Sequence, residues 1–383
     1  MRYYIIAGEA SGDLHGANLV RALRDEDAQA DIQGWGGELM EAAGAIINKH
    51  YRELAFMGFV EVVKNLNTIL GNFKKCKSEI LAFRPDVLIL IDYPGFNLRM
   101  AKWAKQNNIR IFYYISPQIW AWHSSRVHGI KKLVDRMFVI LPFEKDFYKK
   151  YDYDVDFVGH PLLDVFHNFK PDPSFRQQHD LDQKPIIALL PGSRKQEIRV
   201  ALRIMLQMCS RFPDYQFVIA GAPSIDRNYY ETILRENDAS NTSVSLVQNV
   251  TYELLAQSEA ALVTSGTATL ETALLDVPQV VCYKGSPLSY HIARRLVNVK
   301  YISLVNLILD RPLLRELIQE TFNAVELEKE LGLILEQEQR ENMQVAYREL
   351  RKMLGNEGAS ARAAGLMVER LKREGVSGSG DPN

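Results

Sequence analysis

Short aliphatic runs alternate with longer helical patterns along most of the chain, and this alternation is the feature that most limits the possible folds. Strands that alternate with helices are typical of βαβ units, which build parallel sheets. Two series of strand patterns occur, over 3–7, 87–91, 109–114, 136–140 and 155–158, and then over 186–190, 217–220, 243–247, 260–264 and 279–283. The sequence therefore predicts an α/β fold made of two similar parallel-sheet halves.

A polar segment that contains three prolines, over 170–185, separates the two series. A chain of 383 residues exceeds what one ordinary hydrophobic core holds, so two domains are expected. We predict a first domain over 1–170 and a second over 185–345. Charge-rich helices over 346–374 are expected to pack back on the first domain or on a partner chain, and the Gly/Ser tail over 375–383 to be disordered. Two such halves imply a ligand cleft between them.

Composition excludes several classes of protein. The net charge of −1 argues against a dedicated nucleic-acid binder, although a basic stretch with three tryptophans lies over 99–136. That stretch also fits a membrane-facing surface, and it is equally consistent with a solvated basic helix and core tryptophans. No Cys/His cluster suggests a metal site, and the three cysteines are far apart, which fits a reducing compartment. No apolar run approaches the ~20 residues that span a bilayer, so a cytosolic or peripheral protein is expected.

The first half carries two candidate site segments at strand ends. Residues 8–13 follow the first strand with small side chains, and a helix N-terminus there suits an anion or sugar oxygens. Asp92 follows the strand over 87–91, where a carboxylate serves either as a general base or as a cap of the next turn. His160 follows a later strand near the linker, which favours a place in the cleft, although a structural histidine is the default interpretation.

The second half repeats this arrangement with residues suited to phosphate. Ser193 and Arg194 end its first strand, and the arginine either neutralises a diphosphate or pairs with a carboxylate such as Glu197. A second helix opens with three small residues and carries an acid one turn later, which from the sequence alone is best explained by the helix dipole: Ser265, Gly266, Thr267 and Glu271.

One further helix has an apolar face edged with lysines. This pattern is typical of insertion at an anionic membrane surface or of an acyl-chain pocket, but also of a helix that covers its own core. The apolar residues are Phe59, Val62, Val63, Leu66, Ile69, Leu70 and Phe73.

Together these segments resemble the lipid-A-disaccharide synthase family of bacterial glycosyltransferases. The matching segments keep the family's order from residue 3 to about 310, and several together are highly specific: AGEASGD from Ala7, MGFVEV from Met57, IDYPGF from Ile91, YISPQIWAW from Tyr114, LPFEKDF from Leu141, VGHP from Val158, LPGSRKQE from Leu190, SGTATLE from Ser265 and YISLVN from Tyr301. The helical end beyond about 320 matches only in general character, and the Gly/Ser tail does not match.

The resemblance implies a GT-B fold, with two Rossmann-like domains facing a central cleft. It implies inverting transfer of 2,3-diacylglucosamine from its UDP donor to the 6-hydroxyl of 2,3-diacylglucosamine 1-phosphate, which gives a β-1,6-linked disaccharide 1-phosphate and UDP. It implies no cofactor and no metal. The enzyme would belong to a Gram-negative bacterium and lie in the cytoplasm, peripherally attached to the inner membrane. A homodimer through the charged helices after Glu326 is a further possibility.

The resemblance also assigns roles residue by residue. Asp92 matches the family's essential carboxylate and becomes the general base, and Arg194 matches the arginine at the UDP diphosphate. Glu271 takes the position that contacts the ribose, which replaces the dipole explanation. The remaining matches are first-domain residues that face the sugar and polar residues of the nucleotide half: Glu9, Ser11, His160, Ser193, Ser265, Gly266, Thr267 and Asn306. For the apolar helix the resemblance favours lipid contact with partial burial.

Two other functions fit parts of the pattern. A UDP-sugar 2-epimerase shares the two-domain architecture but acts on a soluble sugar, so sedimentation with vesicles would separate it from a lipid-handling enzyme. A non-catalytic module that binds anionic lipid headgroups would have no use for Asp92 together with a nucleotide half. UDP binding without turnover would favour that module.

Overall fold

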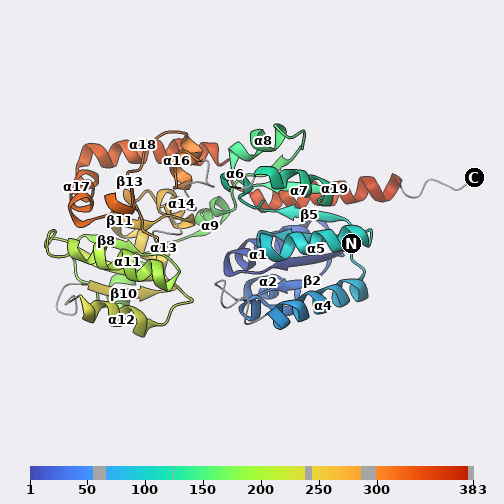
Figure 1. The fold of residues 1–383 in the computed structure, drawn as a ribbon, viewed down its shortest axis with the longest axis horizontal. Coiled ribbons are helices and arrows are strands. Elements are labelled where there is room, and N and C mark those ends of the chain that lie inside the picture. Colours follow the sequence, from blue (N-terminus) through green and yellow to red (C-terminus); the bar gives the residue numbers. More distant parts are fainter. Residues whose placement is uncertain (55–65, 123, 238–243, 286–298, 378–383) are drawn as a thin grey trace, which may run out of the picture. The chain divides into compact units, whose positions relative to one another are not determined.

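The computed structural model describes residues 1–54, 66–122, 124–237, 244–285 and 299–377 of the 383-residue chain (Figure 1). The chain forms two compact units, the first made of Met1–Asp164 and Leu354–Asn383 and the second of Val165–Met353. It leaves the first unit within helix α9 (Leu162–Asn168) and returns after helix α18 (Gln337–Met353). The boundary that the sequence placed at 345 falls inside α18, which is one unbroken helix.

The first unit is built on a seven-stranded parallel sheet with the order β3-β2-β1-β4-β5-β6-β7. Every residue of β4 is buried, and so is every residue of β1 after its first, because helices cover both faces of the sheet. Its strands are β1 (Arg2–Ala7), β2 (Asp31–Gly36), β3 (Ile46–His50), β4 (Val87–Ile91), β5 (Ile111–Tyr114), β6 (Arg136–Val139) and β7 (Asp156–Phe157).

Helices connect these strands, and the last helix of the chain belongs to this unit, where α19 (Ala359–Ser377) packs against α1 (Ala10–Glu26). The other helical segments are α2 (Glu38–Ala42), η1 (Tyr51–Leu54), α4 (Leu66–Phe83), α5 (Pro94–Gln106), α6 (Ile119–Trp122), η2 (Ser124–Arg126), α7 (Val127–Leu133) and α8 (Pro142–Lys149).

The second unit holds a six-stranded parallel sheet with the order β10-β9-β8-β11-β12-β13. The strands are β8 (Ile186–Leu190), β9 (Gln216–Gly221), β10 (Val244–Gln248), β11 (Ser258–Thr264), β12 (Gln279–Tyr283) and β13 (Glu316–Ile318). Besides α18, the helical segments are α10 (Phe175–Gln178), α11 (Lys195–Met205), η3 (Leu206–Met208), α12 (Arg227–Glu236), α13 (Thr251–Ala256), α14 (Thr267–Leu274), α16 (Leu304–Leu309), η5 (Gln319–Thr321) and α17 (Ala324–Leu335).

Both sheets have the doubly wound strand order, so the predicted fold class of two Rossmann-like parallel-sheet domains is confirmed. All ten predicted strands are present, within about three residues at their ends. Strands β2, β3 and β13 were not predicted from the sequence. Glycines interrupt β2, and Ile46, which opens the edge strand β3, is 57% exposed, so neither has the continuous apolar pattern of a central strand.

Candidate active site

Each sheet has one position where the strand order reverses, and ligands of such folds bind beyond the carboxyl ends of the strands at that position. In the first unit it lies between β1 and β4, and in the second between β8 and β11. The segments that follow these four strands are the ones that the sequence singled out, beginning at Gly8, Asp92, Pro191 and Ser265. Topology therefore defines two half-sites, one in each unit.

In the first half-site, the loops after β1 and β4 pack tightly together. A Cβ atom on Gly8 would lie 2.2 Å from the ring of Tyr93, so only glycine allows this approach. Glu9 is exposed, directly precedes α1 and makes no capping hydrogen bond with its side chain. Ser11 is exposed in the first turn of the same helix. The structure thus places Glu9 and Ser11 on the loop beside the Asp92 segment.

Asp92 stands on a strained backbone that its neighbours hold in place. Asp92 and Tyr93 have φ angles of 42° and 48°, in the left-handed region that residues other than glycine rarely adopt. The Asp92 carbonyl accepts hydrogen bonds from the Tyr113 hydroxyl at 2.6 Å and from Asn97 Nδ2 at 2.8 Å. The Asp92 N–H donates to the Tyr114 carbonyl at 3.2 Å. Strain of this kind concentrates at functional sites, where the surrounding structure fixes the geometry.

The surroundings of Asp92 also change its acidity. Burial raises the pKa of its carboxyl from 3.8 to about 6, and the negative charge of Glu9 adds to the rise, while the Tyr93 N–H opposes it. The carboxylate is still ionised at neutral pH, but it is more basic than an ordinary aspartate. A general base works best when its pKa is near the working pH, so this environment suits proton abstraction.

Asp13, the last residue of the glycine-rich segment, has a structural role. Its buried carboxylate accepts the N–H groups of Gly37 at 2.7 Å and of Leu39 and Met40 at 3.1 Å, which caps the start of α2. The resemblance motif therefore mixes a residue that fixes the fold with residues that face the ligand side.

The motifs after β5 and β6 have no role that their sequences alone suggest, but the structure connects them. Buried Ser116 donates to Glu144 Oε1 at 2.6 Å, and Glu144 Oε2 accepts the Leu141 N–H at 2.9 Å. Burial raises the pKa of Glu144 to about 7. Ile115, a β-branched residue, has a φ of 63°, so the loop after β5 is strained at the same sheet edge as Asp92. No local signal in the sequence pairs Ser116 with Glu144.

In the second half-site, the turn after β8 presents an arginine to solvent. Gly192 has a φ of 104°, a conformation that favours glycine. Ser193 follows it, and Arg194 directly precedes α11 with its side chain 72% exposed. Arg194 Nη1 pairs with Glu197 Oε1 at 2.8 Å, the partner that the sequence offered as the alternative to a phosphate. An exposed ion pair contributes at most about 1 kcal/mol, so an incoming phosphate can replace Glu197.

The turn after β11 forms the facing part of this half-site. Gly266 and Thr267 are exposed where α14 begins, and a Cβ atom on Gly266 would meet nothing within 4 Å. Ser265 is anchored through its hydroxyl, which donates to the Ile302 carbonyl at 2.8 Å. The open N-terminus of α14 beside the β8 turn has the N–H groups and dipole that favour an anion.

Glu271 lies one turn into α14. Tyr252 donates its hydroxyl to Glu271 Oε1 at 3.0 Å, and burial raises the pKa of the Glu271 carboxyl above its usual range. This hydrogen bond occupies one of the two carboxylate oxygens, so the arrangement is compatible with a further hydroxyl donor on the other.

Asn306 has a structural position instead of an open one. It is fully buried, and its Nδ2 donates both to the Leu314 carbonyl at 2.9 Å and to Glu316 Oε1 at 3.0 Å. Glu316 also accepts the N–H groups of Ile302 and Ser303, both at 2.9 Å. Both amide hydrogens of Asn306 are used inside the protein, so it supports the Ile302 segment that anchors Ser265.

His160 is likewise buried. Its Nδ1 accepts the Leu162 N–H at 3.2 Å, and burial together with nearby His15 lowers its pKa to about 3. Burial lowers the pKa of His15 to about 4, so both imidazoles are neutral at physiological pH. The default interpretation of a structural histidine describes His160 in this structure.

The apolar helix is described only in part. Phe59, Val62 and Val63 lie outside the described residues, and the side chain of Leu66 at the start of α4 is not described. Leu70 is 57% exposed and Ile69 is half-buried. Phe73 stacks on Phe96 with a centroid distance of 4.4 Å and packs against the core.

Among the described residues, no cluster of three or more His, Cys, Asp or Glu side chains could hold a metal ion. The same part of the chain contains no helix both long and apolar enough to cross a membrane.

Known structures show the same architecture. UDP-GlcNAc 2-epimerase from Neisseria meningitidis, bound to UDP-GlcNAc, has a TM-score of 0.65 at 14% identity, covering 97% of this chain and 100% of that one. The glycosyltransferase of kitacinnamycin has a TM-score of 0.62 at 13% identity, covering 97% and 98%. At such low identity these likenesses show the fold alone. The chain therefore has a fold of the GT-B class, with one half-site at the switch point of each sheet.

Sequence relatives identify the family within that class. The family described as Lipid-A-disaccharide synthetase matches residues 3–369. The chain is 41% identical to the lipid-A-disaccharide synthase of Syntrophus aciditrophicus (strain SB), covering 96% of this chain and 97% of the relative. It is 39% identical to that of Trichlorobacter lovleyi, covering 97% and 98%. The chain belongs to the lipid-A-disaccharide synthase family and is a glycosyltransferase, and the epimerase alternative is not favoured.

Proposed function

We propose that this enzyme joins UDP-2,3-diacylglucosamine to 2,3-diacylglucosamine 1-phosphate. The acceptor 6-hydroxyl attacks the anomeric carbon of the donor, the bond from that carbon to the diphosphate oxygen breaks, and UDP departs. A single in-line attack inverts the anomeric centre and gives a β-1,6-linked disaccharide 1-phosphate. Family membership supports the reaction, and the observation that carries the mechanism is Asp92, whose pKa is raised to about 6 at a sheet switch point.

Asp92 takes the proton from the acceptor hydroxyl as the new bond forms. Its more basic carboxylate accepts that proton more readily than an ordinary aspartate would, yet it is ionised at neutral pH. The hydrogen bonds from Tyr113 and Asn97 to the Asp92 carbonyl hold the backbone of Asp92 in one conformation, from which its side chain starts. Glu9 and Ser11, on the neighbouring loop, contact the sugar hydroxyls.

The second half-site binds UDP. Arg194 leaves Glu197 and forms charge-assisted hydrogen bonds to the diphosphate, since such bonds are about twice as strong as neutral ones. Ser193, Gly266 and Thr267 offer hydroxyl or backbone N–H groups to the same oxygens. Glu271 accepts a ribose hydroxyl through the oxygen opposite its contact with Tyr252. These groups stabilise the negative charge that builds on the leaving group without any cofactor.

The acyl chains of the substrates lie against the first turns of α4. Leu70 is exposed there, and Lys74 and Lys75 are exposed on the following turn. An apolar surface edged with lysines suits the cytoplasmic face of an anionic inner membrane, where a peripheral enzyme would meet both lipid substrates.

The test is a reaction in mild detergent that contains both substrates and a chelator. Disaccharide and UDP are followed by mass spectrometry for wild type, Asp92→Ala, Asp92→Asn and Arg194→Ala. Disaccharide from wild type and a loss of at least ~100-fold in both Asp92 variants support the reaction and the base. Product with the Asp92 variants nearly unaffected would discard the mechanism, and no product from folded, UDP-binding protein would discard the substrates.

A further inference from the structure

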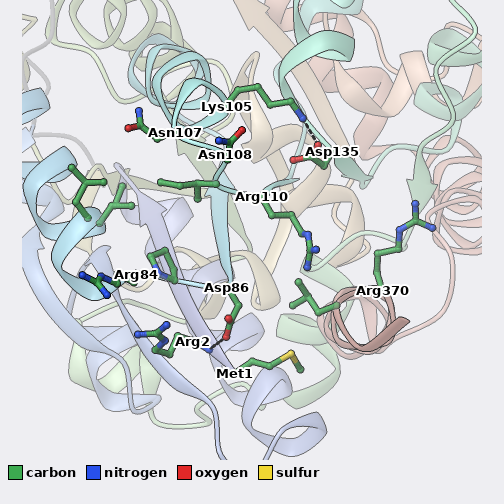
Figure 2. A pocket seen from close by; sticks show the side chains of 15 residues that line it. Met1, Arg2, Arg84, Asp86, Lys105, Asn107, Asn108, Arg110, Asp135 and Arg370 are labelled. Carbon is green, nitrogen blue, oxygen red and sulfur yellow. Dashed lines mark hydrogen bonds and ion pairs between the residues drawn. The ribbon is translucent and has the colours of Figure 1, made fainter. Parts of the chain in front are cut away.

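A cavity of about 1030 Å³ lies in the first unit, away from the half-site at the carboxyl ends of its strands (Figure 2). Its lining includes Arg2, Asp86, Arg110 and Asp135, each at or directly before the first residue of β1, β4, β5 or β6. The cavity therefore opens at the amino edge of the sheet, opposite Asp92. It is large enough for a small-molecule ligand, whose sites usually measure roughly 300–1,000 Å³.

Positive charge from separate parts of the chain converges on this cavity. Five cationic side chains line it against two carboxylates, Asp86 and Asp135. The cations come from β1, the α4–β4 connection, α5, the α5–β5 connection and α19: Arg2, Arg84, Lys105, Arg110 and Arg370. Like charges gathered in one hollow repel each other, and an anionic ligand would relieve that repulsion.

Some of this charge has a structural explanation. Arg2 Nη1 donates to the Phe83 carbonyl at 3.0 Å, at the C-terminus of α4, where the helix dipole favours a cation. Lys105 pairs with Asp135 at 2.5 Å. These two contacts fix strand and helix ends, so Arg2 and Lys105 alone would not indicate a ligand.

The two carboxylates of the cavity, Asp86 and Asp135, accept hydrogen bonds from backbone N–H groups. Asp86 accepts the Arg2 N–H at 2.7 Å, and Asp135 accepts the Ile111 N–H at 2.9 Å. Arg84 is exposed, and the described part of the chain shows no hydrogen bond or ion pair from its guanidinium. In Figure 2, Arg84 lies on one side of Asp86 and Arg110 on the other, and both residues line the cavity.

We propose that this cavity, here called the amino-edge groove, binds a phosphate-bearing anion through Arg84 and Arg110. Guanidinium groups match phosphate oxygens in pairs, which makes arginine the residue of choice for phosphate. The chemistry is shared by an anionic lipid headgroup and by a free phosphate or diphosphate compound. The groove belongs to one unit and makes no use of Asp92 or Arg194, so the proposal stands independently of the reaction proposed above.

The test measures binding of inorganic pyrophosphate by calorimetry and binding to vesicles by sedimentation. All proteins carry Arg194→Ala, which weakens phosphate binding at the β8 turn. The groove variant is Arg84→Gln with Arg110→Gln, and Arg84→Gln alone serves if the double variant does not fold. The control is Lys102→Ala with Lys132→Ala, which removes the same charge from exposed positions of this unit outside the groove. Vesicles contain phosphatidylglycerol or only phosphatidylcholine.

Pyrophosphate should bind the parent protein and the control alike, and the groove variant at least about tenfold more weakly, because one charged hydrogen bond contributes roughly tenfold or more. If the groove variant also loses affinity for phosphatidylglycerol vesicles by a similar factor, the natural ligand is a lipid headgroup. Unchanged vesicle binding with lost pyrophosphate binding would identify a free phosphate compound. The proposal fails if the control loses as much affinity as the groove variant, or if the parent protein does not bind pyrophosphate.

Discussion

Replacing Asp92 with asparagine should stabilise the first unit while it abolishes catalysis. The carboxylate is held in surroundings that disfavour its charge, and burial is the larger cause, followed by Glu9. Asparagine has nearly the same shape and no charge, and the hydrogen bonds from Tyr113 and Asn97 go to the backbone carbonyl, so they persist. The stability effect therefore isolates the cost of the ionised carboxylate.

The magnitude follows from the pKa. A rise from 3.8 to about 6 is about two units, which corresponds to about 3 kcal/mol once the group is fully ionised. Because the folded-state pKa is raised, the folded state holds the proton more tightly and wild type loses stability as pH rises from about 4 through about 6. About half of that loss is present at pH 5. The advantage of Asp92→Asn should thus grow by about 1.5 kcal/mol between pH 5 and pH 8.

Hydrogen exchange of the β1 and β4 amides measures the opening free energy of this sheet in the intact chain. Wild type and Asp92→Asn are compared at pH 5 and pH 8, with the exposed Asp25→Asn as the control, which should change stability by less than about 0.5 kcal/mol. A stability difference that stays constant between the two pH values would refute the raised pKa. An Asp92→Asn protein less stable than wild type at pH 8 would refute the claim that the charge is held at a cost.

Three further outcomes are expected. Glu9→Gln removes the negative charge that is the second cause of the raised Asp92 pKa. The acidic limb of the kcat/KM pH profile should therefore move below about pH 6, and a limb that does not move would contradict the coupling between Glu9 and Asp92. Tyr113→Phe removes a hydrogen bond to the Asp92 carbonyl, so kcat should fall at least about threefold while the KM for the UDP donor changes little, as steady-state kinetics will show. Arg194→Ala should weaken UDP binding, measured by calorimetry, at least about tenfold. Arg194→Lys should restore only part of the affinity, because a single ammonium cannot pair with two oxygens in the same plane. Full affinity in the alanine variant would mean that Arg194 pairs only with Glu197 and not with the diphosphate.

The sequence revealed the fold and the ends of four strands because those signals are local. Continuous aliphatic runs such as β4 and β8 predict buried strands, and small residues after them predict turns. The strand order then brings the segments at Gly8 and Asp92 to the same edge of the sheet, because β1 and β4 are neighbours. The carboxylate expected beside Arg194 was also present, as Glu197 is three residues along the same helix.

Interactions between distant parts of the chain were not predictable. The raised pKa of Asp92 depends on burial and on Glu9. Asp92 follows β4, whereas Glu9 lies in the loop after β1. Asn306 is predicted to bind the nucleotide sugar, but its amide donates to the Leu314 carbonyl and to Glu316. The amino-edge groove draws its arginines from segments that are adjacent only in the folded unit. Residue identity gives the chemistry that is possible, whereas burial and partners decide which chemistry remains.

The same strand order serves two opposite electrostatic tasks in this protein. In the first unit the switch point carries Glu9 and Asp92, and a diphosphate placed there would meet two carboxylates and be repelled. In the second unit the corresponding position carries Arg194 and the open N-terminus of α14, which attract it. Under the reaction proposed above, the carboxylate pair would thus have two consequences: it would exclude the UDP group from the first half-site, and it would make Asp92 basic enough to deprotonate a hydroxyl. Replacing Glu9 alone should therefore both weaken the repulsion of UDP from the first half-site and lower the pKa of Asp92. A Glu9 variant that changed only one of these two properties would show that they do not arise from the same charge.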